Sequence, residues 1–271
     1  MRRIVFVGAG SMAEALIKGI IKENKIMPEA IYVMNKSDVD QLSRLKDTYQ
    51  IEIVCPKRRV LQEADLVVLA VKPKDVATAC QEIKDFLSRN AVIISVVAGV
   101  STQTLSSLLG ERPIARVMPN TSASVGFSAS AVCWNNLVTD EQQLIVSDLL
   151  QAIGSVKSVN EKDMHIVTAL SGSGPAYLYY FAEQFEKAAV QHDLHPKIAR
   201  DLFIQTMEGA VEMLKTGDAE PNELRRKVTS PGGTTEAGIQ QLIQYKVDEA
   251  IFACIDAAQN KSRMLGKQYE Q

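Results

Sequence analysis

The stretch Arg3-Ile4-Val5-Phe6-Val7-Gly8-Ala9-Gly10-Ser11-Met12-Ala13 predicts a β-strand, a glycine-rich turn and the start of a helix, in that order. Gly8 permits the tight turn, Gly10 lets the backbone approach a pyrophosphate, and Ala13 lets the helix lie close to the sheet. Free N–H groups at the helix start attract the phosphates. We therefore expect a dinucleotide-binding site at this turn.

Outward from this turn, strands alternate with helices as far as about residue 160. Leu66–Val71 and Val92–Val97 are nearly continuous apolar runs, which suit strands buried on both faces of a parallel sheet. The other predicted strands are Arg3–Val7, Ile31–Met34, Ala115–Met118, Ser130–Cys133 and Ser155–Val159, and the predicted helices are Ser11–Glu23, one through Leu42 and Leu45, and Glu141–Ile153. This alternation predicts an α/β fold, with a Rossmann-like doubly wound sheet in residues 1–160.

Residues 161–271 differ in character, because strand patterns disappear and long amphipathic helices follow. The predicted helices are Ala176–Gln191, Pro196–Thr216, Pro221–Lys227, Thr234–Leu242 and Val247–Leu265. Pro196 and Pro221 stand where a proline starts a helix. These helices are too apolar for a single thin layer, so we predict an all-α C-terminal domain that forms a homodimer.

Composition excludes several classes of partner. The net charge of −2 over 271 residues gives no electrostatic reason to expect binding to nucleic acid or an anionic membrane. No run reaches the ~18 apolar residues of a membrane span, and we see no signal peptide. The four cysteines and three histidines show no metal-ligand spacing, so we expect no metal and a cytoplasmic protein with reduced thiols.

The end of the second predicted strand carries the residues that choose the cofactor. An NAD site places Asp or Glu about 20 residues after the glycine motif, on the ribose 2′-hydroxyl. Here the chain reads Asn35-Lys36-Ser37, so Lys36 can pair with a 2′-phosphate and no carboxylate repels it. We expect NADPH to be preferred, with NADH possible because Asp38 follows. A second basic cluster, Lys57-Arg58-Arg59, either adds to this site or lies on a solvated loop.

Two further strand ends are candidates for the same site, because strand carboxyl ends face the ligand crevice in this fold. Pro73 forces the chain out of the predicted strand Leu66–Val71, and we expect Lys72 to have a structural rather than a catalytic role. Asn120 follows another strand and either touches the nicotinamide or substrate, or stabilises its own loop. The predicted cofactor-binding residues are Gly8, Ala9, Gly10, Ser11, Met12, Ala13, Asn35, Lys36, Ser37, Ala70, Val71, Lys72, Pro73 and Asn120.

Several segments together resemble the pyrroline-5-carboxylate reductase family. The most specific is Val228-Thr229-Ser230-Pro231-Gly232-Gly233-Thr234-Thr235, a loop that leads into a helix. The others, in the family's order, are Gly8–Met12, Ala70–Pro73, Ser95–Val100, Arg116–Thr121 and Leu170–Ala176. The resemblance implies a homodimer with interleaved helical domains, some members assembling further. It also implies an oxidoreductase that reduces 1-pyrroline-5-carboxylate to L-proline with NAD(P)H, the last step of proline biosynthesis.

The Ser230–Thr235 loop is the predicted substrate site. Its glycines expose backbone N–H groups at a helix start, which suits a carboxylate. By resemblance, the Thr235 hydroxyl points at the imine nitrogen and is the catalytic group. The predicted substrate-binding residues are Ser230, Gly232, Gly233, Thr234, Thr235 and Asn120.

Departures from the family pattern leave some alternatives open. Ser122 and Ser128 stand where the family often has proline and glycine, and Pro56 where it often has asparagine, so substrate tolerance and the hold on the adenosine end are in doubt. A reductase of other cyclic imines stays possible, as does a nucleotide-binding regulatory protein. A β-hydroxyacid dehydrogenase type is disfavoured, because the helix after Gly174 carries no lysine before Lys187.

Overall fold

The computed structural model describes residues 2–55 and 57–267. Pro56, one of the departures noted above, lies outside these residues. Contacts divide the chain into two compact units: Gly174–Asp256 forms one, and the residues before and after it form the other. Each unit is described by itself.

The first unit is built on one eight-stranded sheet in the order β3-β2-β1-β4-β5-β6-β7-β8. All neighbouring strands are parallel except β6 and β7. The strands are β1 (Ile4–Val7), β2 (Ile31–Met34), β3 (Glu52–Ile53), β4 (Leu66–Leu69), β5 (Val92–Ser95), β6 (Ile114–Met118), β7 (Ser128–Trp134) and β8 (Gly154–Ser158). The strand order reverses between β1 and β4, which is where such sheets bind ligands. The predicted doubly wound fold is confirmed.

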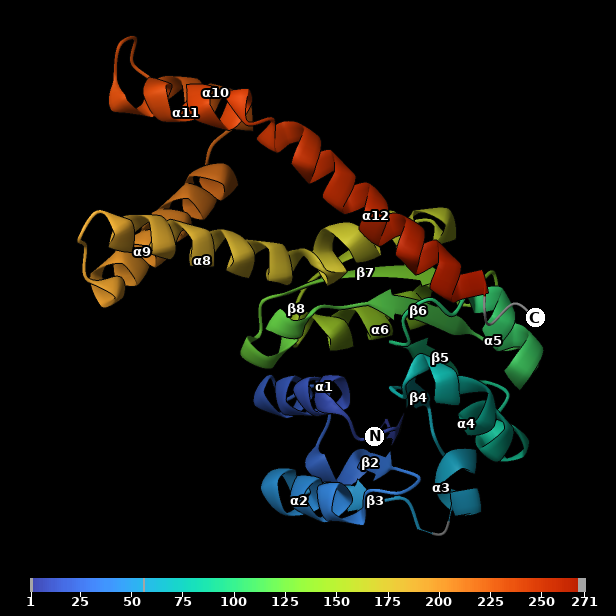
Figure 1. Ribbon diagram of the computed structural model, residues 1–271. Coiled ribbons are helices and arrows are strands. Elements are labelled where there is room, and N and C mark those ends of the chain that lie inside the picture. Colours follow the sequence, from blue (N-terminus) through green and yellow to red (C-terminus); the bar gives the residue numbers. More distant parts are fainter. Residues whose placement is uncertain (1, 56, 268–271) are drawn as a thin grey trace. The chain divides into compact units, whose positions relative to one another are not determined.

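Helices cover both faces of this sheet, so its central strands are buried on both sides (Figure 1). One face carries α1 (Ser11–Lys22), α2 (Val39–Tyr49) and α6 (Asp140–Gln151). The other carries α3 (Lys57–Gln62), α4 (Val76–Ile83) and α5 (Thr102–Leu109).

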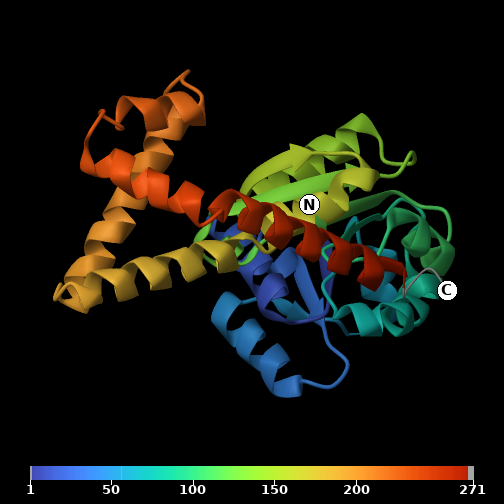
Figure 2. The same ribbon diagram turned by 45° about the horizontal axis from the view of Figure 1, so that its top comes forward.

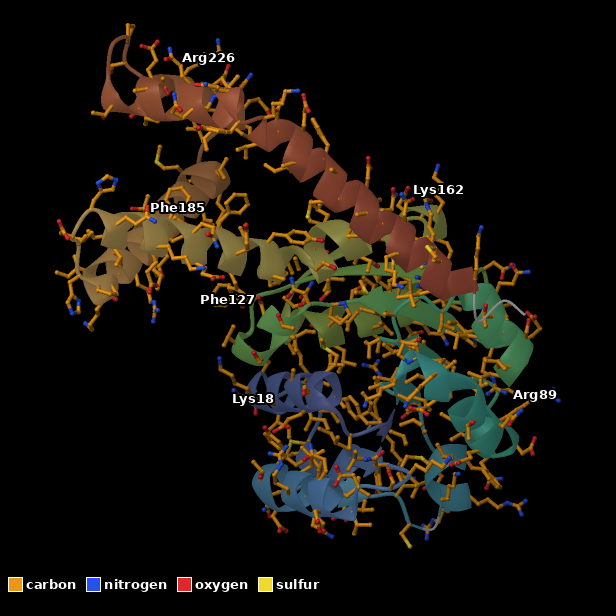
Figure 3. All side chains as sticks on the ribbon, viewed as in Figure 1. Lys18, Arg89, Phe127, Lys162, Phe185 and Arg226 are labelled. Carbon is orange, nitrogen blue, oxygen red and sulfur yellow. The ribbon has the colours of Figure 1, made fainter. Side chains whose placement is uncertain are left out.

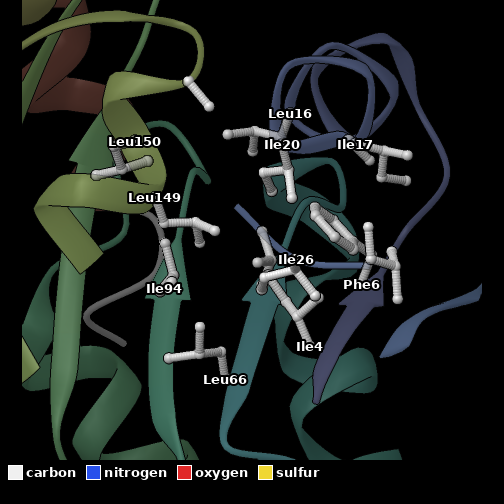
Figure 4. Packing of buried hydrophobic residues seen from close by; sticks show 14 of the residues in the cluster. Ile4, Phe6, Leu16, Ile17, Ile20, Ile26, Leu66, Ile94, Leu149 and Leu150 are labelled. Atoms are coloured by element: carbon white, nitrogen blue, oxygen red, sulfur yellow. The ribbon is translucent and has the colours of Figure 1, made fainter. Parts of the chain in front are cut away.

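Alternation along each strand supplies the two hydrophobic cores. Ile4 and Phe6 of β1 pack under α1, as Figure 4 shows, whereas Val5 and Val7 face the α3–α5 side. All four side chains are at most 3% exposed. Burial of this kind contributes about 1.5–3 kcal/mol for each large apolar side chain, and it fixes β1 at the centre of the sheet. The turn after β1 is therefore held rigidly.

Three helices of this unit, α3, α4 and α5, were not among the predicted elements. Each has only six to eight residues, too short for a clear helical period in the sequence. The strands β3, β4, β5 and β6 nevertheless all run parallel, and parallel strands need crossover connections between them. The Lys57-Arg58-Arg59 cluster thus begins a helix, and its assignment to a loop is wrong.

The second unit contains helices α8 (Gly174–Gln191), α9 (Pro196–Thr216), α10 (Pro221–Lys227), α11 (Thr234–Gln244) and the first part of α12 (Val247–Lys267). Among its described residues there is no strand (Figure 2), as predicted. Phe185 of α8, labelled in Figure 3, stacks on Phe203 of α9 with ring centroids 4.7 Å apart. Arg200 adds two hydrogen bonds to Glu186.

These helices leave much of their apolar surface uncovered within one chain. No described residue of α8, α10 or α11 is buried. Exposed apolar side chains include Leu178, Tyr179, Leu202, Met213, Ile243 and Phe252. Apolar surface on this scale marks an interaction site.

The residues from 161 to 173 pack with the sheet, although their sequence pattern is helical. They form α7 (Met164–Val167) and a π-helical turn, Thr168–Gly172. The residues of α12 from Ala257 onward also belong to the first unit. Contacts thus divide the chain at 173 and 256, and the division into domains 1–160 and 161–271 stays a prediction. None of the described helices meets the length and apolarity needed to cross a bilayer.

Candidate dinucleotide site

The turn between β1 and α1 is shaped by Gly8. Its φ of +107° lies in a region that side chains disfavour, and its N–H donates to Met34 O at 2.8 Å. A Cβ on Gly8 would lie 2.4 Å from Ala70 O. Gly8 is therefore needed for β1, β2 and β4 to come together at their carboxyl ends.

Gly10 has a different role, because its backbone is ordinary and its surroundings are open. Its φ is −78°, and a Cβ built on it would meet no described atom within 4 Å. Among the described residues no side chain caps the start of α1, which leaves its first N–H groups available to an anion. An open glycine at a free helix start fits a pyrophosphate.

A cleft of about 450 Å³ opens beside this turn, within the usual size range of ligand pockets. It lies at the carboxyl ends of β1, β2 and β4, where the strand order reverses. Of the predicted cofactor residues, it is lined by Gly8, Ala9, Gly10, Ser11, Asn35, Lys36, Ser37, Ala70, Val71 and Lys72. The structure therefore brings three separate predicted segments together in one cavity.

Four predicted cofactor residues do not line this cleft. Ala13 is fully buried and Met12 packs against the same core, so both support α1 from behind. Pro73 starts the short helical turn Pro73–Asp75 after β4. Asn120 lies in the loop after β6. Direct cofactor contact by these four residues stays a prediction.

The sequence analysis missed one wall of the cleft. Asp75, Thr78, Ala79 and Glu82 line it from one side of α4, at the helical spacing of three and four residues. That spacing was readable only if α4 had been recognised. Gln41 of α2 also lines the cleft, and its Nε2 donates to Ala9 O at 3.0 Å. This bond ties α2 to the glycine turn.

A charged cluster supports the Gln41 contact. Arg44 donates to Gln41 Oε1 at 3.1 Å and pairs with Glu14 on the first turn of α1. Tyr49 donates to the same carboxylate at 3.0 Å. The hydrogen bond from Arg44 lowers the pKa of Glu14 against the effect of burial, with help from Tyr49. The carboxylate on the first turn of α1 is thus balanced by Arg44.

The charges that line the cleft itself are mixed. Lys36 and Lys72 face three carboxylates, those of Asp38, Asp75 and Glu82. Asp38 caps α2 by accepting from Gln41 N at 2.9 Å. Outside the lining, Lys57 Nζ lies 3.2 Å from Glu82 Oε2.

Asn120 acts as a clamp between two loops of the first unit. Its Oδ1 accepts from Ser122 N at 3.1 Å, and its Nδ2 donates to Ser171 O at 3.0 Å in the π-helical turn. Its own N–H donates to Ser128 Oγ. Ser128, one of the departures from the family pattern, thus helps to hold this loop, and the loop-stabilising interpretation of Asn120 has direct geometric support.

An ion pair with one buried partner, elsewhere in the first unit, was also missed. Arg116 of β6, with a side chain only 4% exposed, pairs with Glu161. The same carboxylate accepts from Thr102 Oγ1 at 2.9 Å and from Cys133 Sγ at 3.1 Å. Burial alone would raise the pKa of Glu161, but Arg116 and these hydrogen bonds hold it below its usual value. The network joins α5, β6, β7 and the turn at Glu161.

The Ser230–Thr235 loop belongs to the second unit. Gly232 has a φ of +72°, and Gly233 is the N-cap of α11. Thr234 and Thr235 open that helix and are exposed. Gly232 N–H already donates to a carboxylate, Glu236 Oε2, at 2.7 Å. The loop therefore presents a backbone amide in a geometry that binds a carboxylate oxygen.

The matches to known proteins extend over nearly the whole chain. The family described as pyrroline-5-carboxylate reductase dimerisation matches residues 161–265, and that described as NADP oxidoreductase, coenzyme F420-dependent, matches residues 3–99. Pyrroline-5-carboxylate reductase 2 of Bacillus subtilis is 39% identical over 270 residues, covering 99% of this chain and 97% of that one. The Staphylococcus haemolyticus reductase is 36% identical and covers 98% of each.

Solved structures agree with these sequence relatives. A pyrroline-5-carboxylate reductase from Coxiella burnetii has a TM-score of 0.90 and 36% identity, covering 97% of this chain and 98% of that one. The Plasmodium falciparum pyrroline carboxylate reductase, solved with NADP bound, has a TM-score of 0.86 and 30% identity, covering 98% of both. With this extent of similarity in both sequence and fold, the chain belongs to the pyrroline-5-carboxylate reductase family.

Proposed function

We propose that the protein reduces 1-pyrroline-5-carboxylate to L-proline with NADPH, the last step of proline biosynthesis. A hydride from the dihydronicotinamide adds to the imine carbon, the C=N bond becomes a C–N bond, and the ring nitrogen carries the proton of the iminium form. The observation that carries the proposal is the glycine cleft and the Ser230–Thr235 loop in one chain that matches reductases along nearly its full length.

The cofactor is proposed to lie in the cleft at the carboxyl ends of β1, β2 and β4. Gly10 and the start of α1 would hold the pyrophosphate, and Lys36 would pair with the 2′-phosphate. Ala70 and Val71 line the same cleft toward the sheet. The glycine-turn geometry supports this assignment, because Gly10 leaves room for close backbone approach.

The substrate carboxylate is proposed to bind the backbone amide of Gly232 in place of Glu236, while the Gly233 N–H donates to Ser230 O at 3.0 Å and shapes the turn. The Gly232 bond to Glu236 supports this, since it is an amide–carboxylate contact of the required kind. Thr235 would contact the ring nitrogen through its hydroxyl. The iminium enters already protonated, so the main task of these groups is to orient the ring against the nicotinamide and to stabilise the shift of charge.

The working form is proposed to be a homodimer or a larger homo-oligomer. The exposed apolar side chains of α8, α9 and α11 support this, as does the match to a dimerisation family over residues 161–265. The protein is proposed to work in the cytoplasm, which agrees with the four cysteines being free thiols.

The test is the oxidation of NADPH by purified protein with 1-pyrroline-5-carboxylate, followed by the loss of absorbance of the reduced cofactor. Thr235→Ala should lower kcat by about 100-fold or more, in the range for loss of one positioned hydrogen-bonding group at a centre whose charge changes. Thr235→Ser should keep most of the activity because it keeps the hydroxyl. Thr216→Ala is the matched control, another exposed helix threonine, whose hydroxyl donates to Glu212 O one turn earlier in its own helix.

Two outcomes would contradict the proposal in different places. Folded protein that binds NADPH but does not oxidise it with this substrate is not this reductase, and other cyclic imines then become the substrates to try. Full activity in Thr235→Ala removes Thr235 from the mechanism and leaves the reaction intact.

A further inference from the structure

One ion pair stands at the cleft wall that the sequence did not predict. Glu82 lines the cleft from α4, and Lys57 of α3 lies 3.2 Å from its carboxylate. The two side chains are 34% and 40% exposed. An ion pair this exposed contributes little to stability, because water screens it and two long side chains lose freedom. Stability therefore gives little reason for the pair.

The charge balance of the cleft gives a better reason for the pair of Lys57 with Glu82. Its lining holds two lysines and three carboxylates, an excess of one negative charge. A 2′-phosphate adds about −1.5 to −2 charge at pH 7. Glu82 would repel such a group, because it lines the same cleft as Lys36 and like charges oppose each other there. Lys57 brings the count to three lysines and three carboxylates.

We propose that Lys57, through its ion pair with Glu82, is a specificity-determining residue that lets the cleft accept the 2′-phosphate of NADPH. Lys36 supplies the direct attraction at the end of β2, and Lys57 removes the opposing charge of α4. The inference rests on the proposed function only in taking this cleft as the dinucleotide site. It does not depend on the substrate or on Thr235.

The test uses equilibrium binding and needs no turnover. Isothermal titration measures the affinity for adenosine 2′,5′-bisphosphate and for adenosine 5′-diphosphate, and the result is the ratio of the two. Lys57→Met keeps the apolar stem and removes the charge, and it should weaken the bisphosphate by about tenfold while the diphosphate changes much less. Glu82→Gln should strengthen the bisphosphate. The double variant should return the ratio close to that of the unchanged protein.

Lys46→Met is the matched control. Lys46 pairs with Glu52 at 3.4 Å, is similarly exposed, and is not part of the cleft lining. It should leave the ratio unchanged. Thermal unfolding of every variant checks that it is folded.

Several results would overturn the inference. Equal weakening of both ligands in Lys57→Met would make the pair a structural link between α3 and α4. An unchanged ratio in Lys57→Met, or a weaker bisphosphate in Glu82→Gln, would reject the charge argument. If neither ligand binds the unchanged protein, the cleft is not a dinucleotide site. Loss of reductase activity with a normal ratio contradicts only the proposed reaction.

Discussion

Gly8 and Gly10 are two residues apart, and the structure predicts opposite consequences for replacing each with alanine. In Gly8→Ala the new Cβ lies 2.4 Å from Ala70 O, which is backbone and cannot turn aside. The φ of +107° is also unfavourable for alanine. The backbone conformation costs about 1–3 kcal/mol and the overlap about 1–3 kcal/mol more. Together they lower the free energy of unfolding by ~2–6 kcal/mol.

In Gly10→Ala neither penalty arises. The φ of −78° suits alanine, and the new Cβ meets no described atom within 4 Å. The free energy of unfolding should stay equal or rise by up to about 1 kcal/mol, since alanine restricts the unfolded chain. The methyl group extends toward the cleft, where the pyrophosphate must approach the backbone. Affinity for NADPH should fall by about tenfold or more, which corresponds to ~1.4 kcal/mol.

The assay is thermal unfolding by circular dichroism without cofactor, combined with calorimetric titration of NADPH. At about 2–4 °C per kcal/mol, Gly8→Ala should lower Tm by ~4–24 °C. Gly10→Ala should keep Tm and lose affinity. Equal Tm values for the two variants would refute the packing argument at Gly8. Unchanged NADPH affinity in Gly10→Ala would refute the assignment of the pyrophosphate to this turn.

Two further predictions concern the buried polar contacts of the first unit. Glu161→Gln should cost about 1–3 kcal/mol at pH 7, less than for a fully buried pair because the Glu161 side chain is 37% exposed while Arg116 is buried. The pKa of Glu161 is lowered on folding from its usual value of 4.5, so its contribution is present above that value and is lost as the pH falls through the lower pKa of the folded state. Urea unfolding at pH 7 and at about pH 3 should show the difference between the variant and the unchanged protein shrinking, and a constant difference would contradict this. Asn120→Ala should lower the free energy of unfolding by about 1–3 kcal/mol, because the N–H of Ser122 and the carbonyl of Ser171 lose their partner. Asn120→Asp keeps the bond to Ser122 but places a carboxylate oxygen against the Ser171 carbonyl, so it should not restore the Tm of the unchanged protein, and a fully restored Tm would show that the Ser171 bond contributes nothing.

Much of the fold could be predicted because its signals are local. The pattern at Arg3–Ala13 specified a strand, a turn and a helix, and strict apolar runs marked the central strands. The helices Pro196–Thr216 and Pro221–Lys227 have the predicted bounds, since a proline fixes each start. The predicted strands Leu66–Val71 and Val92–Val97 end two residues early, at Leu69 and Ser95. Apolarity continues there after sheet pairing has stopped.

The candidate site likewise has one part that local sequence specifies and another that depends on tertiary structure. The sequence by itself determined the glycine motif, the absence of a carboxylate at Asn35-Lys36-Ser37, and the family resemblance, because each is read from neighbouring residues. The wall formed by α4 was not predictable from local sequence. The pair of Lys57 with Glu82 was not predictable either, since it joins residues 25 positions apart. Such contacts depend on how crossover helices pack on the sheet.

Asn120 is the clearest example of a residue whose hydrogen-bond partners only tertiary structure decided. Its position after a strand allowed either contact with a ligand or stabilisation of its own loop. The fold brings Ser171, 51 residues away, to the side-chain amide of Asn120, so that both Nδ2 and Oδ1 are hydrogen-bonded. Arg116 and Glu161, 45 residues apart, are joined in the same way. Side-chain chemistry specifies which bonds a residue can make, whereas packing of the strands and helices specifies which partner arrives.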